Sequence, residues 1–232
     1  MKFYTNVQLI GNQFLVRGVE NGRRYEHRDE FFPTLFVKSK KSLKTKYKTL
    51  NGESVEAINP GTVRECRDFY KRYDDVEGFE IYGNDRYIYQ YISEKYPEDE
   101  VKFDISQIKL VTLDIETTSE QGFPNVESCV EEILAITIQD YTTKQIITWG
   151  SKPFNNKQKN VTYNYCANEY ELLTSFINYW MQDVPDVITG WNIQMFDIPY
   201  ICRRLDRVLG EKLMKRMSPW GLVSEGEIHV MG

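Results

Sequence analysis

The sequence predicts an α/β (α+β) fold in two parts: a smaller, β-rich domain over residues 1–107 and an α/β sandwich over residues 108–232. Two observations lead to this prediction. In the first part, strand-like segments are separated by turn-forming dipeptides such as Gly11-Asn12 and Asn21-Gly22, which is typical of antiparallel strands. In the second part, strand-like segments are followed by a helical segment, then a further strand and a further helix.

The composition is that of a folded protein. Hydrophobic residues make up 41% of the 232 residues and aromatic residues 14%, with 29 basic and 34 acidic side chains. This balance excludes an intrinsically disordered or fibrous chain. No segment approaches the ~18 consecutive apolar residues that a membrane span requires, and the first nine residues are too polar for a signal peptide. We therefore expect a cytoplasmic protein without membrane association.

The cysteines predict neither a disulfide framework nor a zinc site. All four are far apart in the sequence, no C-x-x-C motif occurs, and the chain has only two histidines. We expect free thiols at Cys66, Cys129, Cys166 and Cys202.

The elements of the β-rich part follow in order from its pattern. Strands are predicted over 3–10, 13–19, 23–27, 34–37 and 79–82. Apolar residues at helical spacing predict helices over 62–73 and 86–96, and Pro97 ends the second of them.

The elements of the second part begin with an apolar strand over 110–115. An antiparallel pair is predicted over 133–141 and 145–150, joined by a polar turn. A helix begins after Asn168, with Glu171 placed as in a capping box. A strand over 186–191 and a helix over 196–209 complete the sandwich, and Gly210 ends that helix.

Three carboxylates carry the chemistry that the sequence suggests. Side chains alternate along a strand, so Asp114 and Glu116 point the same way while Ile115 enters the core. Asp197 lies where a strand has ended and a helix begins. Together the three acids could hold Mg²⁺ or Mn²⁺ for phosphodiester hydrolysis. The alternative is a solvated strand face, with Asp197 serving only as a helix N-cap.

Two motifs resemble a known family. Asp114-Ile115-Glu116 followed by Gly122-Phe123-Pro124, and Thr189-Gly190-Trp191-Asn192 followed by Phe196-Asp197-Ile198-Pro199-Tyr200, resemble the first two proofreading motifs of family B DNA polymerases. The resemblance is to the T-even-like bacteriophage type, and segments 31–37 and 87–96 resemble its amino-terminal domain. It extends over essentially the whole chain.

The resemblance implies a ribonuclease-H-like (DnaQ-like) 3′→5′ exonuclease domain that proofreads a DNA primer end, behind an amino-terminal domain. In that family the acids matching Asp114 and Glu116 bind two metal ions, and the acid matching Asp197 supports the second metal. Asn192 would orient the site, and Phe123 would stack on the terminal base; the alternative for Phe123 is a buried loop anchor. Trp191, at the end of a buried strand, is expected in the core.

A lysine run in the first part offers a second contact with nucleic acid. Lys40, Lys41, Lys44 and Lys46 lie in a segment, residues 37–50, that contains no acid, and such a run can neutralise phosphates. The alternative is a solvated loop.

The family supplies a further metal-binding aspartate from a third motif, and a polymerase palm, neither of which this sequence contains. We therefore expect a partial exonuclease domain, weak or inactive alone, whose partners are a single-stranded DNA 3′ end or primer-template and the remaining polymerase domains or fragment. In a phage setting it would act in the cytoplasm of the infected host. Two alternatives remain: a non-catalytic nucleic-acid-binding or assembly module of a split polymerase, and a self-sufficient exonuclease in which Glu225 or His229 replaces the missing aspartate.

Overall fold

The structure is a computed structural model that describes residues 1–39, 45–97, 101–120 and 122–226. The chain divides into two compact units, Met1–Gln107 and Ile108–Gly232. Each unit has its own cluster of buried apolar side chains. Within the described part of the chain, no helix is both long enough and apolar enough to cross a membrane.

Unit 1 contains two antiparallel sheets. The first, in the order β1-β2-β3, is the predicted meander: β1 (Lys2–Ile10), β2 (Gln13–Glu20) and β3 (Arg23–Glu30). The second has the order β5-β6-β4-β7. It comprises β4 (Leu35–Lys38), β5 (Tyr47–Lys48), β6 (Ser54–Ile58) and β7 (Ile81–Tyr82). Of these strands, β5 and β6 were not predicted, because β5 has two residues and the alternation of β6 covers only residues 54–57.

Two helices complete the core of unit 1. In α1 (Val63–Tyr73), Thr62 and Glu65 form a reciprocal capping box, and in α2 (Tyr87–Lys95), Tyr87 and Tyr91 are buried. The Tyr91 ring stacks on Phe14 of β2 with the ring centroids 4.6 Å apart. Both helices were predicted from their apolar spacing, and their burial confirms that reading.

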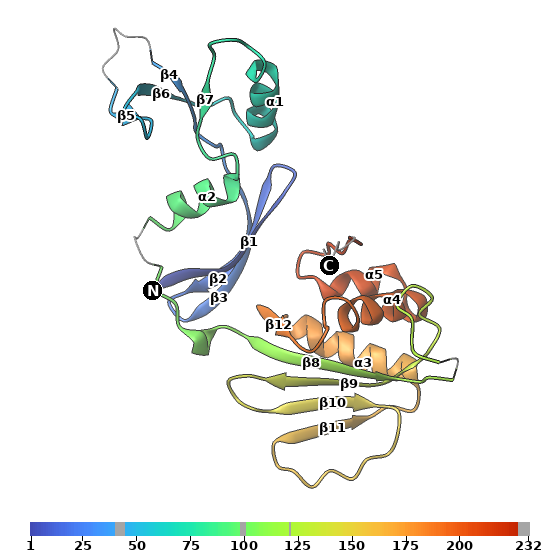
Figure 1. The fold of residues 1–232 in the computed structure, drawn as a ribbon. Coiled ribbons are helices and arrows are strands. Elements are labelled where there is room, and N and C mark those ends of the chain that lie inside the picture. The colour runs from blue at the N-terminus through green and yellow to red at the C-terminus, as the bar shows by residue number, and fades with distance from the viewer. Residues whose placement is uncertain (40–44, 98–100, 121, 227–232) are drawn as a thin grey trace. The chain divides into compact units, whose positions relative to one another are not determined.

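Unit 2 is built on one mixed sheet with the strand order β11-β10-β9-β8-β12. Its strands are β8 (Leu110–Thr117), β9 (Ile133–Asp140), β10 (Ile146–Gly150), β11 (Val161–Tyr165) and β12 (Val187–Thr189). Neighbours β8, β9 and β10 pair antiparallel, as predicted, whereas β11 and β12 pair parallel to β10 and β8. Figure 1 shows β11 and β12 at the two edges of this sheet.

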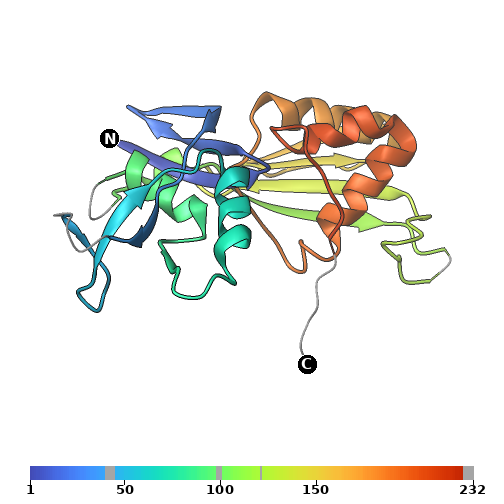
Figure 2. The same ribbon diagram turned by 90° about the horizontal axis from the view of Figure 1, so that it is seen from above.

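Helices α3 (Glu169–Gln182) and α4 (Asp197–Leu209) cover one face of the sheet (Figure 2). Their apolar stripes pack on the side chains of β8, β9 and β10 that point to that face, among them Leu113, Ile136 and Trp149. Asn168 caps α3 by accepting a hydrogen bond from the Glu171 N–H at 3.0 Å. The Glu171 carboxylate reaches the Ala167 N–H, one residue before the cap, rather than the cap residue itself.

The C-terminal part of unit 2 contains the short helix α5 (Glu211–Met214) and the 3-10 turn η2 (Lys215–Met217). A further 3-10 turn, η1 (Ile105–Gln107), ends unit 1. Gly210 ends α4, as predicted, and has a positive φ of 87°. The predicted mixed α/β class with a β-rich first part is confirmed, and β11 is the strand of unit 2 that the sequence pattern missed.

Candidate active site

Two acids lie on the open face of β8, an interior strand between β9 and β12. Asp114 and Glu116 are exposed, whereas Leu113 and Ile115 between and beside them are buried in the core. Asp114 pairs with Thr137 of β9 and Glu116 with Ala135. The alternation that the sequence predicted therefore places both carboxylates on the face that α3 and α4 do not cover.

The third acid approaches the same strand from helix α4. Asp197 is the first helical residue, not the N-cap, because Phe196 holds that position. Its carboxylate oxygen Oδ1 accepts a hydrogen bond from the Ile115 backbone N–H at 3.2 Å, and only 3% of the residue is exposed. Burial raises the pKa of Asp197, and the nearby charge of Asp114 raises it further. The structure thus brings Asp197 into the electrostatic field of Asp114.

The connection from β12 to α4 places Asp197. A side chain at Gly190 would lie 2.5 Å from the Leu113 carbonyl oxygen, so only glycine lets this segment pass so close to β8. Asn192 has a positive φ of 55°, and its carbonyl oxygen accepts hydrogen bonds from the N–H groups of Met195 and Phe196. The backbone of the exposed Asn192 therefore forms the turn before α4. This explains why the residue is placed here without the predicted orienting role of its side chain, which stays a prediction.

The exposure of Trp191 differs from the prediction made from the sequence. It was expected in the core, yet 93% of it is exposed. The physical reason is that β12 ends at Thr189, two residues earlier than predicted, and the chain then turns away from the sheet. Trp191 is thus a surface residue of the connection between β12 and α4.

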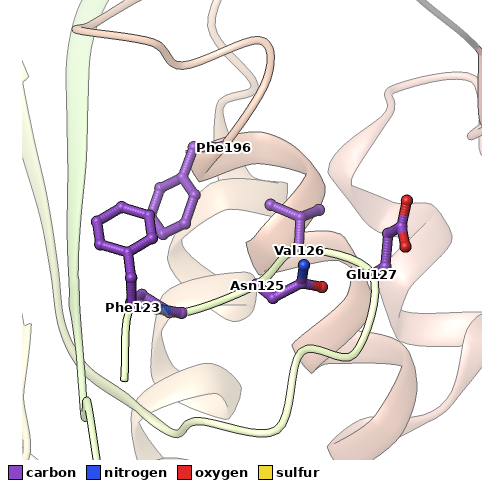
Figure 3. A pocket seen from close by; sticks show the side chains of 6 residues that line it. Phe123, Asn125, Val126, Glu127 and Phe196 are labelled. Atoms are coloured by element: carbon purple, nitrogen blue, oxygen red, sulfur yellow. The ribbon is translucent and has the colours of Figure 1, made fainter. Parts of the chain in front are cut away.

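Phe123 lies on the loop that follows β8, and 89% of it is exposed, which contradicts the alternative of a buried anchor. Its ring centroid is 6.0 Å from that of Phe196, directly before Asp197. Figure 3 shows the two rings side by side at one end of a pocket whose remaining lining comes from Pro124, Asn125, Val126 and Glu127. An exposed aromatic ring supported by a second ring is suited to stack on a base.

Three arginines of α4 donate hydrogen bonds to backbone carbonyl oxygens of this loop. Arg203 donates to the Glu127 carbonyl oxygen at 3.1 Å, Arg204 to the Cys129 carbonyl oxygen at 3.0 Å, and Arg207 to those of Ser128 and Cys129. Cys129 itself has a positive φ of 45°, a conformation that costs free energy unless its surroundings impose it. These three arginines were not among the predicted site residues, although they lie on one turn of an amphipathic helix.

A buried ion pair joins α3 to α4 behind the loop. Arg204 donates from Nε to Glu169 Oε1 at 2.8 Å and from Nη2 to Glu169 Oε2, and both residues are about 5% exposed. Glu169 also accepts the Ile133 N–H at the start of β9, at 2.8 Å. Burial lowers the pKa of Arg204, but the hydrogen bond and charge of Glu169 outweigh it and leave the pKa raised. The pair fixes α4, and with it Asp197, against the sheet.

The donor atoms of the site suit a hard divalent cation, because carboxylate oxygens are the ligands that Mg²⁺ and Mn²⁺ prefer. Across the described ranges, however, no group of three or more His, Cys, Asp and Glu side chains is arranged to hold a metal ion. The structure therefore shows two carboxylates on one strand face and a third beside them, without a closed ligand set.

The other predicted site residues are placed only in part. Lys40, Lys41, Lys44 and His229 lie outside the described residues. Lys46 stands over the Tyr47 ring with Nζ 5.0 Å from the ring centroid, which leaves its role with nucleic acid a prediction. Glu225, suggested as a replacement ligand, forms an ion pair with Arg203 at 3.0 Å.

Comparison with known proteins identifies relatives. Residues 80–231 match the family model described as DNA polymerase family B, exonuclease domain. The DNA-directed DNA polymerase of Escherichia phage RB69 is 30% identical over 244 residues, which is 94% of this chain and 27% of the relative. That of Enterobacteria phage T4 is 30% identical over 256 residues, or 99% of this chain and 28% of the relative. A DNA polymerase of Thermococcus litoralis is 32% identical over 111 residues, 47% of this chain.

Unit 2 has a mixed five-stranded sheet with α3 and α4 on one face and acids on the interior strand β8, and it matches the exonuclease class of domain. The chain belongs to DNA polymerase family B and carries that family's exonuclease domain, which confirms the predicted resemblance. It spans about a quarter of the length of its phage relatives.

Proposed function

We propose that this chain provides the 3′→5′ proofreading site of a family B DNA polymerase, which removes a mispaired nucleotide from a primer strand. The observation that carries the proposal is the approach of buried Asp197 to the strand that bears Asp114 and Glu116. Membership in the family supports it.

In this proposal Asp114 and Glu116 bind divalent metal ions and Asp197 supports the second ion. When bound there, Mg²⁺ or Mn²⁺ would supply an activated water and would stabilise the leaving oxygen of the phosphodiester. The Ile115 N–H fixes the Asp197 carboxylate. Phe123 stacks on the terminal base, and the exposed Asn192 helps to orient the site.

The substrate would be the single-stranded 3′ end of a DNA primer, and the product a deoxynucleoside monophosphate. Three carboxylates are one fewer than the family resemblance implies, so we expect slow hydrolysis by the chain itself and faster hydrolysis when the other polymerase domains are present. A missing anionic ligand leaves the attacking water less acidic and less well placed, and the loss of one such interaction costs about 10²-fold in rate.

Metal binding and hydrolysis test the proposal separately. Calorimetric titration with Mn²⁺ should show binding to the chain and its loss in Asp114→Ala/Glu116→Ala. Asp206→Asn is the matched control, since Asp206 is an exposed acid of α4. Unchanged Mn²⁺ binding in the double variant would sink the assignment.

Hydrolysis of a 5′-labelled oligonucleotide then distinguishes the alternatives. Slow, metal-dependent shortening from the 3′ end that Asp114→Asn abolishes supports the proposal. Full activity in the isolated chain would instead favour the self-sufficient nuclease. DNA binding without any cleavage, with or without the other polymerase domains, would favour the non-catalytic module.

A further inference from the structure

The charge of unit 2 is strongly uneven. After Leu110 the sequence has 10 basic and 16 acidic residues, yet residues 141–168 contain four lysines and no acid. All four lysines are exposed. A basic segment in an otherwise acidic unit favours an anionic partner such as a phosphate backbone, although the Asp140 carboxylate, which accepts from the Thr143 N–H, borders it.

The fold gathers these lysines at one edge of the sheet. Lys144 lies in the turn between β9 and β10, and the loop between β10 and β11 (residues 151–160) passes outside the edge strand β11 (Figure 1). The Asn160 side chain donates to the Lys144 carbonyl oxygen at 3.2 Å, and the Ile146 N–H donates to the Asn160 carbonyl oxygen at 2.8 Å. Turn and loop are thereby joined. We call this surface the basic edge; it comprises Lys144, Lys152, Lys157 and Lys159.

Exposed aromatic rings accompany the lysines. Tyr141 is 52% exposed, Phe154 62% and Tyr165 59%. The Phe154 ring packs on Tyr163 of β11 with the centroids 5.3 Å apart, and the Tyr163 hydroxyl donates to the Lys152 carbonyl oxygen. Lysines beside exposed rings form the usual platform for single-stranded nucleic acid, where phosphates meet cations and bases stack on rings.

The sheet connects the basic edge to the candidate active site. The register runs from Tyr163 through Thr148 and Thr137 to Asp114, one residue on each of four neighbouring strands. All four lie on the face that α3 and α4 leave open. Three strand spacings amount to about 14 Å, a span that a few nucleotides can cover.

We propose that the basic edge binds the phosphodiester backbone of single-stranded DNA a few nucleotides away from the end held at the carboxylates. The claim that this surface lies a few nucleotides from the 3′ end rests on the proposed function. The claim that the basic edge binds single-stranded DNA does not. The competing explanation is that lysines at a sheet edge only prevent pairing with other strands.

The test compares two variants that remove equal charge. The first replaces Lys144, Lys152, Lys157 and Lys159 with Gln; the control replaces Lys71, Lys102, Lys212 and Arg216, which are also exposed. Fluorescence anisotropy with labelled dT3 and dT12 in metal-free buffer measures binding without cleavage.

The proposal expects dT12 affinity to fall about tenfold or more in the first variant, and the slope of log affinity against log salt to become shallower by roughly 0.7 for each lost phosphate contact. Binding of dT3, which offers only two internucleotide phosphates to the basic edge, should change much less than that of dT12, and the control should resemble the parent. Equal dT12 affinity and salt slope in the two variants would overturn the proposal, and self-association of the first variant would then support the edge-protecting explanation.

Two separate measurements distinguish a failure of this proposal from a failure of the proposed function. Mn²⁺ titration reports only on the carboxylates, and dT12 anisotropy in metal-free buffer reports on the basic edge.

Discussion

At the scale of single residues, the positions of the site side chains on strand β8 were predictable, whereas those in the turn after β12 were not. Alternation along β8 places Asp114 and Glu116 on one face because a strand has a period of two. The exposure of Trp191 was not predictable, because it depends on the end of β12 at Thr189 and the positive φ of Asn192. Turns of this kind are fixed by tertiary contacts such as that of Gly190 with Leu113.

The unfavourable placement of Asp197 gives the first prediction at this scale. Its folded pKa is raised, so its ionised form destabilises the fold above its unfolded pKa, and this penalty disappears as the pH falls. In metal-free buffer at pH 7, Asp197→Asn should therefore raise the free energy of unfolding, because burial and the charge of Asp114 both oppose the ionised carboxylate. The amide oxygen still accepts the Ile115 N–H.

Urea unfolding with EDTA measures this effect, with Asp206→Asn as the exposed control on the same helix. Addition of Mn²⁺ should stabilise the parent and not the variant. A variant that is less stable than the parent in EDTA would contradict the prediction.

The thiols give a prediction about pH. All four cysteines are free, as the sequence predicted, and Cys66, Cys129 and Cys166 are buried. Burial raises the pKa of Cys202 to about 11, so its reactive thiolate is scarce at neutral pH. Alkylation of the folded protein should be slow at pH 7 and should accelerate about tenfold for each pH unit, since thiolate concentration limits the rate.

Mass spectrometry after timed iodoacetamide treatment follows this reaction residue by residue, and urea-unfolded protein provides the fast reference. Rapid modification of Cys202 in the folded state at pH 7 would show that the thiol is more acidic than its burial implies.

At the scale of elements, helices were predicted more fully than strands. The apolar spacing of α3 and α4 and the stop at Gly210 were legible, because a helix carries its period and caps within one segment. The strand β11 was missed since it pairs parallel to β10 at a sheet edge after a ten-residue loop, which leaves no hairpin signal. The arginine contacts of α4 were missed because their partners are backbone carbonyls more than 70 residues away.

The buried ion pair between Glu169 of α3 and Arg204 of α4 gives the prediction at this scale. Removal of one partner of a buried pair leaves an uncompensated charge and typically costs 3–5 kcal/mol. We expect that cost for Arg204→Ala, which also frees the Cys129 carbonyl oxygen. The exposed pair Lys215–Glu211 on the neighbouring short helices is the control, and Lys215→Ala should cost less than 1 kcal/mol.

Chemical denaturation of the single variants measures both costs. The double variant Glu169→Gln/Arg204→Met should lose less than the sum of the two single losses, because no charge remains buried without a partner. Additive losses would show that the two residues stabilise the fold independently.

At the scale of the whole molecule, the chain holds two separate cores, one around Phe14, Leu35 and Tyr91 and the other around Leu113, Phe176 and Leu205. Separate cores favour separate unfolding transitions, because the two-state approximation fails for chains of more than one domain. The sequence offers a way to see them. All four tryptophans, at positions 149, 180, 191 and 220, belong to unit 2.

Tryptophan fluorescence should therefore report on unit 2 alone, whereas far-UV circular dichroism reports on both units. We expect the two signals to give different midpoints in urea. Leu35 is fully buried in unit 1, so Leu35→Ala should cost about 2–5 kcal/mol and lower only a transition seen by circular dichroism. Leu172→Ala, in the core of unit 2, is the matched substitution and should lower the fluorescence midpoint. If Leu35→Ala shifts the fluorescence midpoint equally, the two cores unfold as one cooperative unit and the separation argued from their contacts is wrong.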